Sequence, residues 1–255
     1  MKIIVSVKQV PARDSTLRVN QSGKWLETSD LRYEMNEPDA YALEEALQLK
    51  EKSSGEVIVI CAGPQRALQT VREALAKGAD RAIHVETDEI AFDALATARL
   101  LAKAITPESP DLILTGLQSD DLGYGQTGVI LAELLGFAHA TIVMEVEAKG
   151  QTIRVKRELE DGWFQNVSLP LPAVLTIQSG IKKLRYATLM GIKKAKTKEV
   201  KTIPATQLDA DSTASMLIEC VYLPQRHKQT QIFSGEAKQV AKQLVEKLKF
   251  EARVL

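Results

Sequence analysis

The fold is most evident in the segment Asp111-Leu-Ile-Leu-Thr-Gly-Leu-Gln-Ser-Asp-Asp-Leu-Gly-Tyr-Gly-Gln-Thr-Gly-Val-Ile-Leu-Ala-Glu-Leu-Leu-Gly136. Leu112 to Leu114 form a short apolar run, which is typical of a buried parallel β-strand. Residues 116–124 are turn formers and small polar residues, so they predict a loop. Residues 126–135 carry apolar side chains at helical spacing and are followed by Gly136, a common helix stop. The segment therefore predicts a strand, a loop and a helix in succession.

The loop in this segment is a candidate ligand site. Open α/β sheets bind ligands at the C-terminal ends of their strands, and the unpaired N–H groups of a helix start suit a phosphate. Thr127 offers a hydroxyl group at the helix start, and Gly128 lets the backbone approach a ligand closely. We therefore expect a nucleotide site here, with the phosphate of one mononucleotide at Gln126-Thr-Gly128.

The preceding residues repeat the alternation of strand and helix. Strands are expected over residues 2–7, 56–61 and 81–85, and helices over 36–52, around 67–75 and over 91–104. Asn36 is a candidate helix N-cap and Pro38 fits the first turn. The long connection over residues 8–36 is expected to contain a hairpin. This alternation predicts an α/β fold, a mostly parallel sheet flanked by helices.

The pattern changes after Gly136. Strands without intervening helices are expected over residues 139–147, 152–159 and 163–169, as an antiparallel extension, followed by a core strand over 173–177. A basic loop with a short helix covers residues 182–198. Residues 199–255 are expected to form a separate C-terminal arm with a strand over 217–223 and an amphipathic helix over 236–248. The first domain would then span residues 1–198. From the residues alone, the last helix could pack on its own domain or on another chain.

Composition excludes several function classes. The chain has 255 residues, and 33 Lys plus Arg balance 33 Asp plus Glu, so it lacks the basic excess of a general nucleic-acid binder. The two cysteines, Cys61 and Cys220, are far apart, and the three histidines show no metal-ligand spacing. The initial apolar run is too short for a signal peptide, and no stretch is long enough to cross a bilayer. We expect a soluble intracellular protein without a metal site or membrane insertion.

Motifs of common enzyme classes are absent or weak. Gly123-Tyr-Gly-Gln-Thr-Gly128 matches G-x-G-x-x-G, but a loop separates it from its strand, and Asp120 and Asp121 would repel a pyrophosphate. Neither the phosphate-binding G-x-x-x-x-G-K-[ST] nor the nucleophile motif G-x-S-x-G is present. Asp120 and Asp121 have no candidate general acid near them in sequence, and a cysteine such as Cys61 is more often buried than nucleophilic. No catalytic residue is predicted.

Several segments, in their order and spacing, resemble the β subunit of electron transfer flavoproteins. The resemblance extends from the first residue to about Lys198, and its most specific part is the block 185–195. The matching segments are Val5-Ser-Val-Lys8, Asn36-Glu-Pro-Asp39, Ala42-Leu-Glu-Glu-Ala46, Gly63-Pro64, Ala74-Leu-Ala-Lys-Gly-Ala-Asp-Arg81, Gln118, Asp121, Gln126-Thr-Gly128, Arg157-Glu-Leu-Glu160, Pro172-Ala-Val-Leu-Thr176, Arg185-Tyr-Ala-Thr-Leu189 and Ile192-Lys-Lys-Ala195.

The resemblance implies an adenine-nucleotide α-hydrolase-like α/β domain that pairs with an α subunit. FAD would be shared with that α subunit, and the chain would be an electron carrier subunit rather than an enzyme. A structural AMP would be bound by Ser6, Asn36, Asp39, Ala62, Asp121, Gln126, Thr127 and Gly128. Dehydrogenase electron donors would dock on a loop at about residues 182–198 with Leu189 as the anchor, together with Tyr186, Met190 and Ile192. The arm and helix over 199–255 would pack on the partner subunit.

Two departures keep alternatives open. Met190-Gly191 stands where the family often has Pro-Asn, which leaves the identity of the donor undetermined. Asp121-Leu-Gly-Tyr124 replaces the pattern associated with a second, bifurcating FAD, which favours AMP. The alternatives are an electron-bifurcating β subunit with FAD in place of AMP and linkage to NADH, and a flavin-free nucleotide-binding protein. The expected location is the cytoplasm, or the mitochondrial matrix if the source is eukaryotic.

Overall fold

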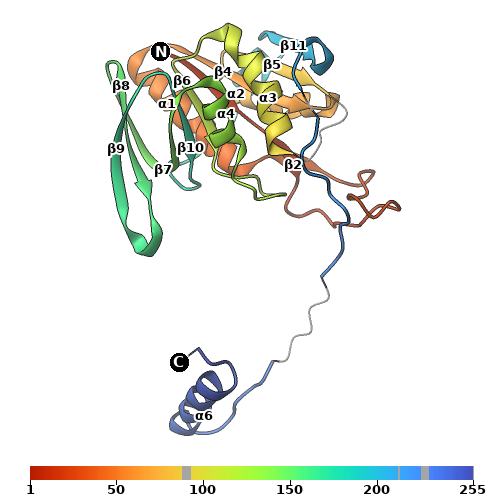
Figure 1. Ribbon diagram of the computed structural model, residues 1–255, viewed down its shortest axis with the longest axis vertical. Coiled ribbons are helices and arrows are strands. Elements are labelled where there is room, and N and C mark those ends of the chain that lie inside the picture. The colour runs from red at the N-terminus through yellow and green to blue at the C-terminus, as the bar shows by residue number, and fades with distance from the viewer. Residues whose placement is uncertain (88–92, 212, 225–229, 255) are drawn as a thin grey trace. The chain divides into compact units, whose positions relative to one another are not determined.

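The computed structural model describes residues 1–87, 93–211, 213–224 and 230–254. The chain forms two compact units, Met1–Val221 and Tyr222–Leu255. Figure 1 shows the ribbon of both, and each unit is described by itself.

The first unit is built on a nine-stranded sheet with the order β11-β5-β4-β1-β6-β10-β7-β8-β9. Every strand pair from β11 to β7 is parallel, whereas β8 pairs antiparallel with both β7 and β9. The predicted parallel sheet with an antiparallel extension is therefore confirmed. The strands are β1 (Lys2–Ser6), β4 (Glu56–Gly63), β5 (Arg81–Glu86), β6 (Leu112–Gly116), β7 (Ala138–Lys149), β8 (Thr152–Glu158), β9 (Phe164–Pro170), β10 (Ala173–Ile177) and β11 (Val200–Pro204).

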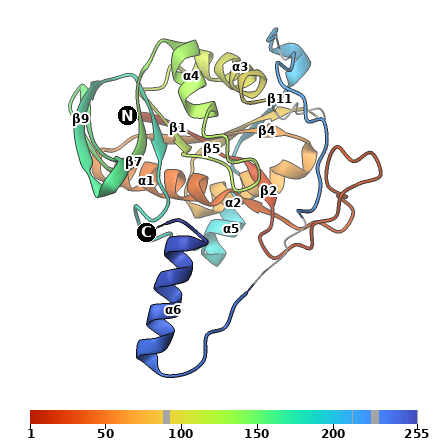
Figure 2. The same cartoon turned by 60° about the horizontal axis from the view of Figure 1, so that its bottom comes forward.

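Helices cover both faces of this sheet (Figure 2). One layer contains α1 (Glu37–Ser53), α2 (Leu68–Lys77) and α5 (Leu189–Ala195), and the other contains α3 (Ala94–Ile105) and α4 (Thr127–Leu135). Short 3₁₀ helices, η1 (Gln65–Ala67), η2 (Thr106–Glu108), η3 (Glu160–Gly162) and η4 (Ala205–Gln207), lie in the connections. The predicted start of the third helix at Ala91 lies outside the described residues.

The two layers explain why the central strands are apolar throughout. In β1, Ile3 and Val5 pack into the cluster on the α1 side, while Ile4 packs into the cluster on the α3 side. All three side chains are fully buried. A strand buried on both faces reads as a continuous apolar run, which is the signal present in the sequence.

The excursion after β1 contains a small antiparallel pair. Strands β2 (Gln9–Pro11) and β3 (Tyr33–Met35) form a two-stranded sheet. Between them Val19 and Leu26 form an isolated antiparallel bridge, and the Asn20 N–H donates to the Trp25 carbonyl at 2.8 Å. The predicted hairpin is present as this short bridge.

The first unit continues beyond the predicted boundary at Lys198. Strand β11 adds to the sheet edge beside β5, and the Asp93 carboxylate accepts the Met216 N–H at 3.0 Å and also the Ser215 N–H. These backbone hydrogen bonds hold a polar segment that has little apolar periodicity. The strand predicted over residues 217–223 is wrong, because the structure has no strand there.

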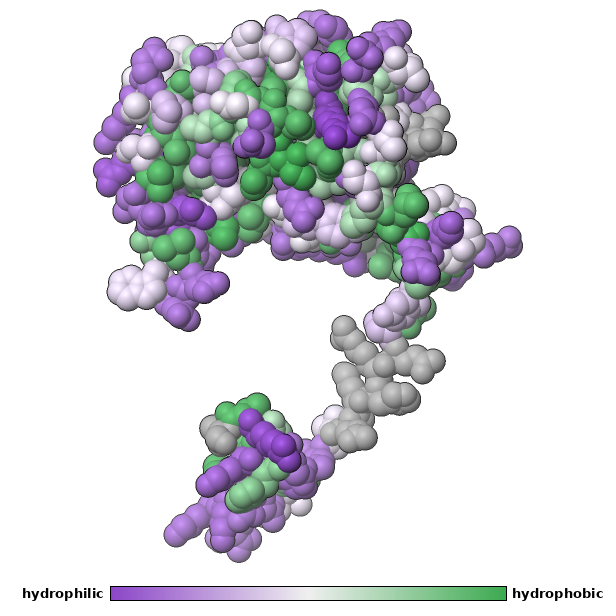
Figure 3. Space-filling model, in the orientation of Figure 1, coloured by the Kyte–Doolittle hydropathy of each residue, from purple (hydrophilic) through white to green (hydrophobic). Residues whose placement is uncertain are grey.

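The second unit contains the predicted amphipathic helix, α6 (Ala237–Phe250). Leu244, Val245 and Phe250 are exposed, with 45%, 51% and 68% of their surface accessible. Figure 3 shows hydrophobic surface beside strongly hydrophilic surface on this unit. An amphipathic helix with its apolar stripe uncovered favours packing against another surface. None of the helices in the described part of the chain has the length and apolar character needed to cross a membrane.

Candidate functional site

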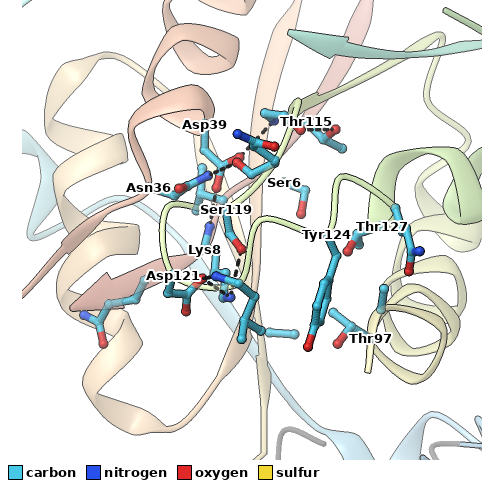
Figure 4. Close-up of a pocket in the computed structure, with 18 of the residues that line it drawn as sticks. Ser6, Lys8, Asn36, Asp39, Thr97, Thr115, Ser119, Asp121, Tyr124 and Thr127 are labelled. Atoms are coloured by element: carbon cyan, nitrogen blue, oxygen red, sulfur yellow. Dashed lines mark hydrogen bonds and ion pairs between the residues drawn. The ribbon is translucent and has the colours of Figure 1, made fainter. Parts of the chain in front are cut away.

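A cavity of about 320 Å³ opens at the carboxyl ends of β1, β4 and β6 (Figure 4). Parallel strands bring these ends together at one edge of the sheet, where α/β proteins bind ligands. The cavity lining includes every residue predicted for the nucleotide site: Ser6, Asn36, Asp39, Ala62, Asp121, Gln126, Thr127 and Gly128. Segments that are far apart in sequence therefore converge on one site.

Asn36 has a different local role from the predicted one. It occupies the N-cap position of α1, but its side chain makes no capping hydrogen bond in the described structure. Instead, its Nδ2 donates to the Gln118 carbonyl at 2.9 Å and its Oδ1 accepts the Asp120 N–H at 2.9 Å. An amide matches a backbone donor and acceptor together, so Asn36 fixes the loop over residues 117–126 onto α1.

Asp39 connects three elements at the floor of the cavity. Its Oδ2 accepts the Lys8 N–H just after β1, and its Oδ1 accepts the Gly116 N–H at the end of β6, both at 2.8 Å. A Cβ atom at Gly116 would lie 2.4 Å from Asp39 Oδ1, so this contact requires glycine. Burial raises the pKa of the Asp39 carboxyl to about 7, against the opposing effect of these hydrogen bonds.

Lys8 neutralises the acidic part of the loop. Its Nζ lies 2.6 Å from Asp121 Oδ1 and 3.3 Å from Ser119 Oγ. Asp121 Oδ1 also accepts the Leu122 N–H at 2.8 Å. The repulsion that Asp121 would exert on a bound phosphate is thereby reduced, and the pair appears at the cavity wall in Figure 4. Lys8 was not among the predicted site residues, although its position close to the end of the first strand is a usable signal.

The start of α4 forms the opposite wall. Gln126 is its N-cap residue and makes no side-chain capping hydrogen bond within the described structure. The first backbone N–H groups of α4 are thus left for a ligand, as expected for an anion site. Gly128, however, serves packing: a Cβ there would lie 2.6 Å from Thr115 Oγ1 and 2.7 Å from Thr176 Cγ2. Glycine therefore lets α4 approach the sheet, and Gly128 also lines the cavity.

Other lining residues were not predicted. Thr115 is the penultimate residue of β6, Thr97 lies in the first turn of α3, and Tyr124 projects from the loop beside Thr127 in Figure 4. The Arg66 guanidinium stacks 4.0 Å from the centre of the Tyr33 ring, and both line the cavity. Thr115 could have been found from its place near a strand end. Tyr124 comes from an irregular loop and Tyr33 from the short strand β3 in the long excursion after β1, and the hydrophobic pattern does not specify the path of either segment.

The residues predicted for partner binding form an exposed apolar patch. We call Tyr186, Leu189, Met190 and Ile192 the docking patch; they are 91%, 82%, 62% and 46% exposed. Leu189 is the first residue of α5 and lies on the surface of this helix rather than in the core. A group of exposed apolar side chains indicates an interaction surface.

Helix α5, which carries Leu189, Met190 and Ile192 of the docking patch, is capped at its start and packs closely on α2. Thr188 caps α5, with Oγ1 accepting the Gly191 N–H at 3.0 Å. A Cβ at Gly191 would lie 2.3 Å from the Ala76 carbonyl oxygen of α2. The glycine that departs from the family pattern is therefore required for close packing of α5 on α2.

Among the described residues, no group of three or more His, Cys, Asp or Glu side chains is arranged to hold a metal ion. Cys61 is fully buried, and burial raises the pKa of its thiol to about 12. This agrees with the prediction that Cys61 is a small core side chain rather than a nucleophile.

Asp39 should make stability fall as pH rises. Its folded-state pKa of about 7 exceeds the ordinary value of 3.8, so the folded state holds the proton more tightly than the unfolded state. The stabilisation is complete below the ordinary pKa and is lost as pH rises through the folded pKa, with a slope of at most about 1.4 kcal/mol per pH unit. In denaturant unfolding of the nucleotide-free chain at several pH values, the difference in unfolding free energy between the wild type and Asp39→Asn should fall with pH by up to this slope. Parallel pH profiles would contradict the assignment.

Gly191→Ala should destabilise the chain because its methyl group cannot fit against the Ala76 carbonyl. Overpacking of this kind typically costs about 1–3 kcal/mol. Met190→Ala is the matched control, since Met190 is the neighbouring exposed residue of the same helix and should change stability by no more than about 0.5 kcal/mol. Denaturant unfolding measures both. Equal effects of the two substitutions would show that α5 can move away from α2 freely.

Comparison with known proteins is consistent with this architecture. The family model described as "Electron transfer flavoprotein domain" matches residues 24–208. The chain is 38% identical over 253 residues to "Electron transfer flavoprotein subunit beta" of Methylophilus methylotrophus, covering 95% of this chain and 96% of the relative. Identity is 38% to the protein named "Electron transfer flavoprotein subunit beta, mitochondrial" of Oryza sativa subsp. japonica, covering 100% of both chains. It is 35% to the human protein named "Electron transfer flavoprotein subunit beta", covering 100% of this chain and 99% of the relative. The chain therefore belongs to the electron transfer flavoprotein family, as a β subunit.

Proposed function

We propose that this β subunit binds a structural AMP in the cavity, pairs with an α subunit and helps to hold FAD that carries electrons from dehydrogenases to a downstream acceptor. The observation that carries the proposal is the convergence of all eight predicted nucleotide-site residues on one cavity. In this proposal the chain is an electron carrier subunit that acts in the cytoplasm, or in the mitochondrial matrix of a eukaryote.

The cavity suits a mononucleotide. Its volume of about 320 Å³ is at the lower end of the range of about 300–1,000 Å³ for small-molecule sites, which favours AMP over a flavin dinucleotide. The uncapped N–H groups of α4, with Gln126 and Thr127, would bind the phosphate. Lys8 offsets the charge of Asp121, so the wall nearest the loop carries little net charge. These features support the AMP assignment over the electron-bifurcating alternative with FAD in this cavity.

Bound FAD would supply the redox chemistry by accepting and releasing one or two electrons. This chain would contribute a rigid wall of the heterodimer and a surface for the electron donor.

Two surfaces would mediate assembly. The docking patch would bind the dehydrogenase, with Leu189 entering an apolar pocket as an anchor. The C-terminal segment, with the uncovered stripe of α6, would pack on the α subunit. The docking patch and α6 belong to different compact units, so the two contacts can be tested separately.

Nucleotide analysis of the purified heterodimer tests the cofactor assignment. After denaturation, chromatography of the released compounds should give one AMP and one FAD per heterodimer. Two FAD molecules without AMP would favour the bifurcating alternative. A complex without flavin that turns over ATP would overturn the electron-carrier function.

Leu189→Ala should weaken reduction by the dehydrogenase while leaving flavin content unchanged. Loss of a buried anchor of about 2 kcal/mol corresponds to about a 30-fold lower kcat/KM for the heterodimer as substrate. Reduction is followed by flavin absorbance with a dehydrogenase that reduces the wild-type heterodimer.

Leu217→Ala is the matched control, because Leu217 is 83% exposed but lies outside the docking patch. It should leave reduction unchanged. If Leu189→Ala loses flavin, Leu189 has a structural role instead; if both variants behave as wild type, the docking patch does not bind the donor.

A further inference from the structure

The segment before the docking patch lacks regular secondary structure. Residues 178–188, between β10 and α5, form no helix or strand. The helix that follows, α5, has seven residues, which is too few for a helix to be stable without tertiary contacts. The positions of Tyr186 and Leu189 are therefore set by tertiary contacts: α5 packs on α2, and side chains attach the preceding segment to the domain.

Arg185, directly before Tyr186, makes the most extensive of these attachments. Its Nε and Nη2 donate to the two carboxylate oxygens of Glu44 at 2.8 and 3.0 Å. Its Nη1 and Nη2 donate to Glu51 at 2.7 and 3.4 Å. The Arg185 backbone N–H also donates to Glu44 at 3.2 Å. Both the side chain and the main chain at this point are thus fixed to α1.

Glu44 is built into the domain as a fixed acceptor. It is 4% exposed, and its Oε1 also accepts from Gln48 Nε2 at 2.8 Å. Burial opposes ionisation of Glu44, but Arg185 and Gln48 outweigh it, and the pKa of this carboxyl lies below its ordinary value. A buried carboxylate with a bidentate guanidinium partner has one preferred geometry. Arg185 therefore meets a rigid partner rather than a mobile surface acid.

A second attachment lies next to the first. Lys182 Nζ lies 3.6 Å from Glu45 Oε2, and Glu45 is 1% exposed. Neither carboxylate oxygen of Glu45 has a hydrogen-bond partner among the described residues. This charge pair restrains the segment without the directional bonds of Arg185. On the far side of the docking patch, Arg72 of α2 donates to the carbonyl groups of Ala195 and Lys198 at 2.6 and 3.0 Å.

We propose that Arg185 is a positioning residue for partner recognition: held by Glu44 and Glu51, it fixes Tyr186 and Leu189 in the orientation that the dehydrogenase binds. The proposal rests on the proposed function of the docking patch. A patch that is ordered before binding loses less conformational entropy on association, so it binds more tightly with the same contacts. Exposed Lys193, Lys194 and Lys196 follow the patch, which suits a partner whose apolar pocket has an acidic rim.

Arg185→Lys in the FAD-loaded heterodimer tests the proposal. Lysine keeps the charge but cannot bridge two carboxylates with a planar fork. Amide hydrogen exchange, without any dehydrogenase present, should become about tenfold faster over residues 186–192 and stay unchanged in the central strands. With a dehydrogenase that reduces the wild type, KM for the heterodimer should rise about tenfold, while kcat and the FAD content stay within about twofold. Unchanged exchange and unchanged KM would overturn the proposal.

Control variants separate this proposal from the docking function. Arg154→Lys, at an exposed arginine of β8, should change neither readout. If Leu189→Ala raises KM and Arg185→Lys does not, the docking patch binds the donor but Arg185 does not position it. If neither raises KM, the docking function itself fails.

A second variant covers the case in which Arg185→Lys prevents assembly of the heterodimer. Glu51→Gln weakens only the contacts of Arg185 with Glu51 and should change both readouts in the same direction, by a smaller factor. No change in that variant would overturn the proposal.

Discussion

The Asp39 carboxylate is the contact on which the arrangement of the nucleotide cavity depends. It joins the backbone after β1 to the backbone at the end of β6 through the first turn of α1. These two N–H groups lie at the ends of neighbouring parallel strands, where the sheet provides no further acceptor. Leaving a buried donor unsatisfied costs about 1–3 kcal/mol, so a buried acceptor at this point is required despite its own desolvation. The tight fit of Gly116 against the carboxylate follows from the same requirement.

Further contacts near Asp39 hold the rest of the cavity wall in place. Asn36 attaches the loop over residues 117–126 to the start of α1, and Lys8 attaches the same loop to the end of β1 through Asp121. The loop is therefore fixed by polar contacts on one side, while α4 packs on the sheet through Gly128 on the other. The site is thus ordered by its own side chains.

The sequence predicted those features that depend on local periodicity. Apolar runs and helical spacing identified the central strands and helices, and the geometry of parallel strands then places Ser6, Ala62 and Gln126 at one edge. Pairings between distant segments were not accessible: the partner of Asp121 is Lys8, and that of Asn36 is the 118–120 backbone. The attachment of residues 199–221 was missed for a related reason. A strand added to an edge and a carboxylate that accepts two backbone N–H groups both stabilise main chain, whatever the side-chain pattern.

Helix α1 relates the nucleotide cavity to the docking patch. Its first turn carries Asp39 at the cavity, and one to three turns later the same helix carries Glu44 and Glu51, which hold Arg185. The helix is buried against the sheet along most of its length, so its two ends keep a fixed relation. A ligand that stabilises the first turn of α1 would therefore also stabilise the support of the docking patch, without contacting it. In the proposed function, the nucleotide would thereby keep rigid the helix to which the docking patch is attached, a role that requires no redox chemistry.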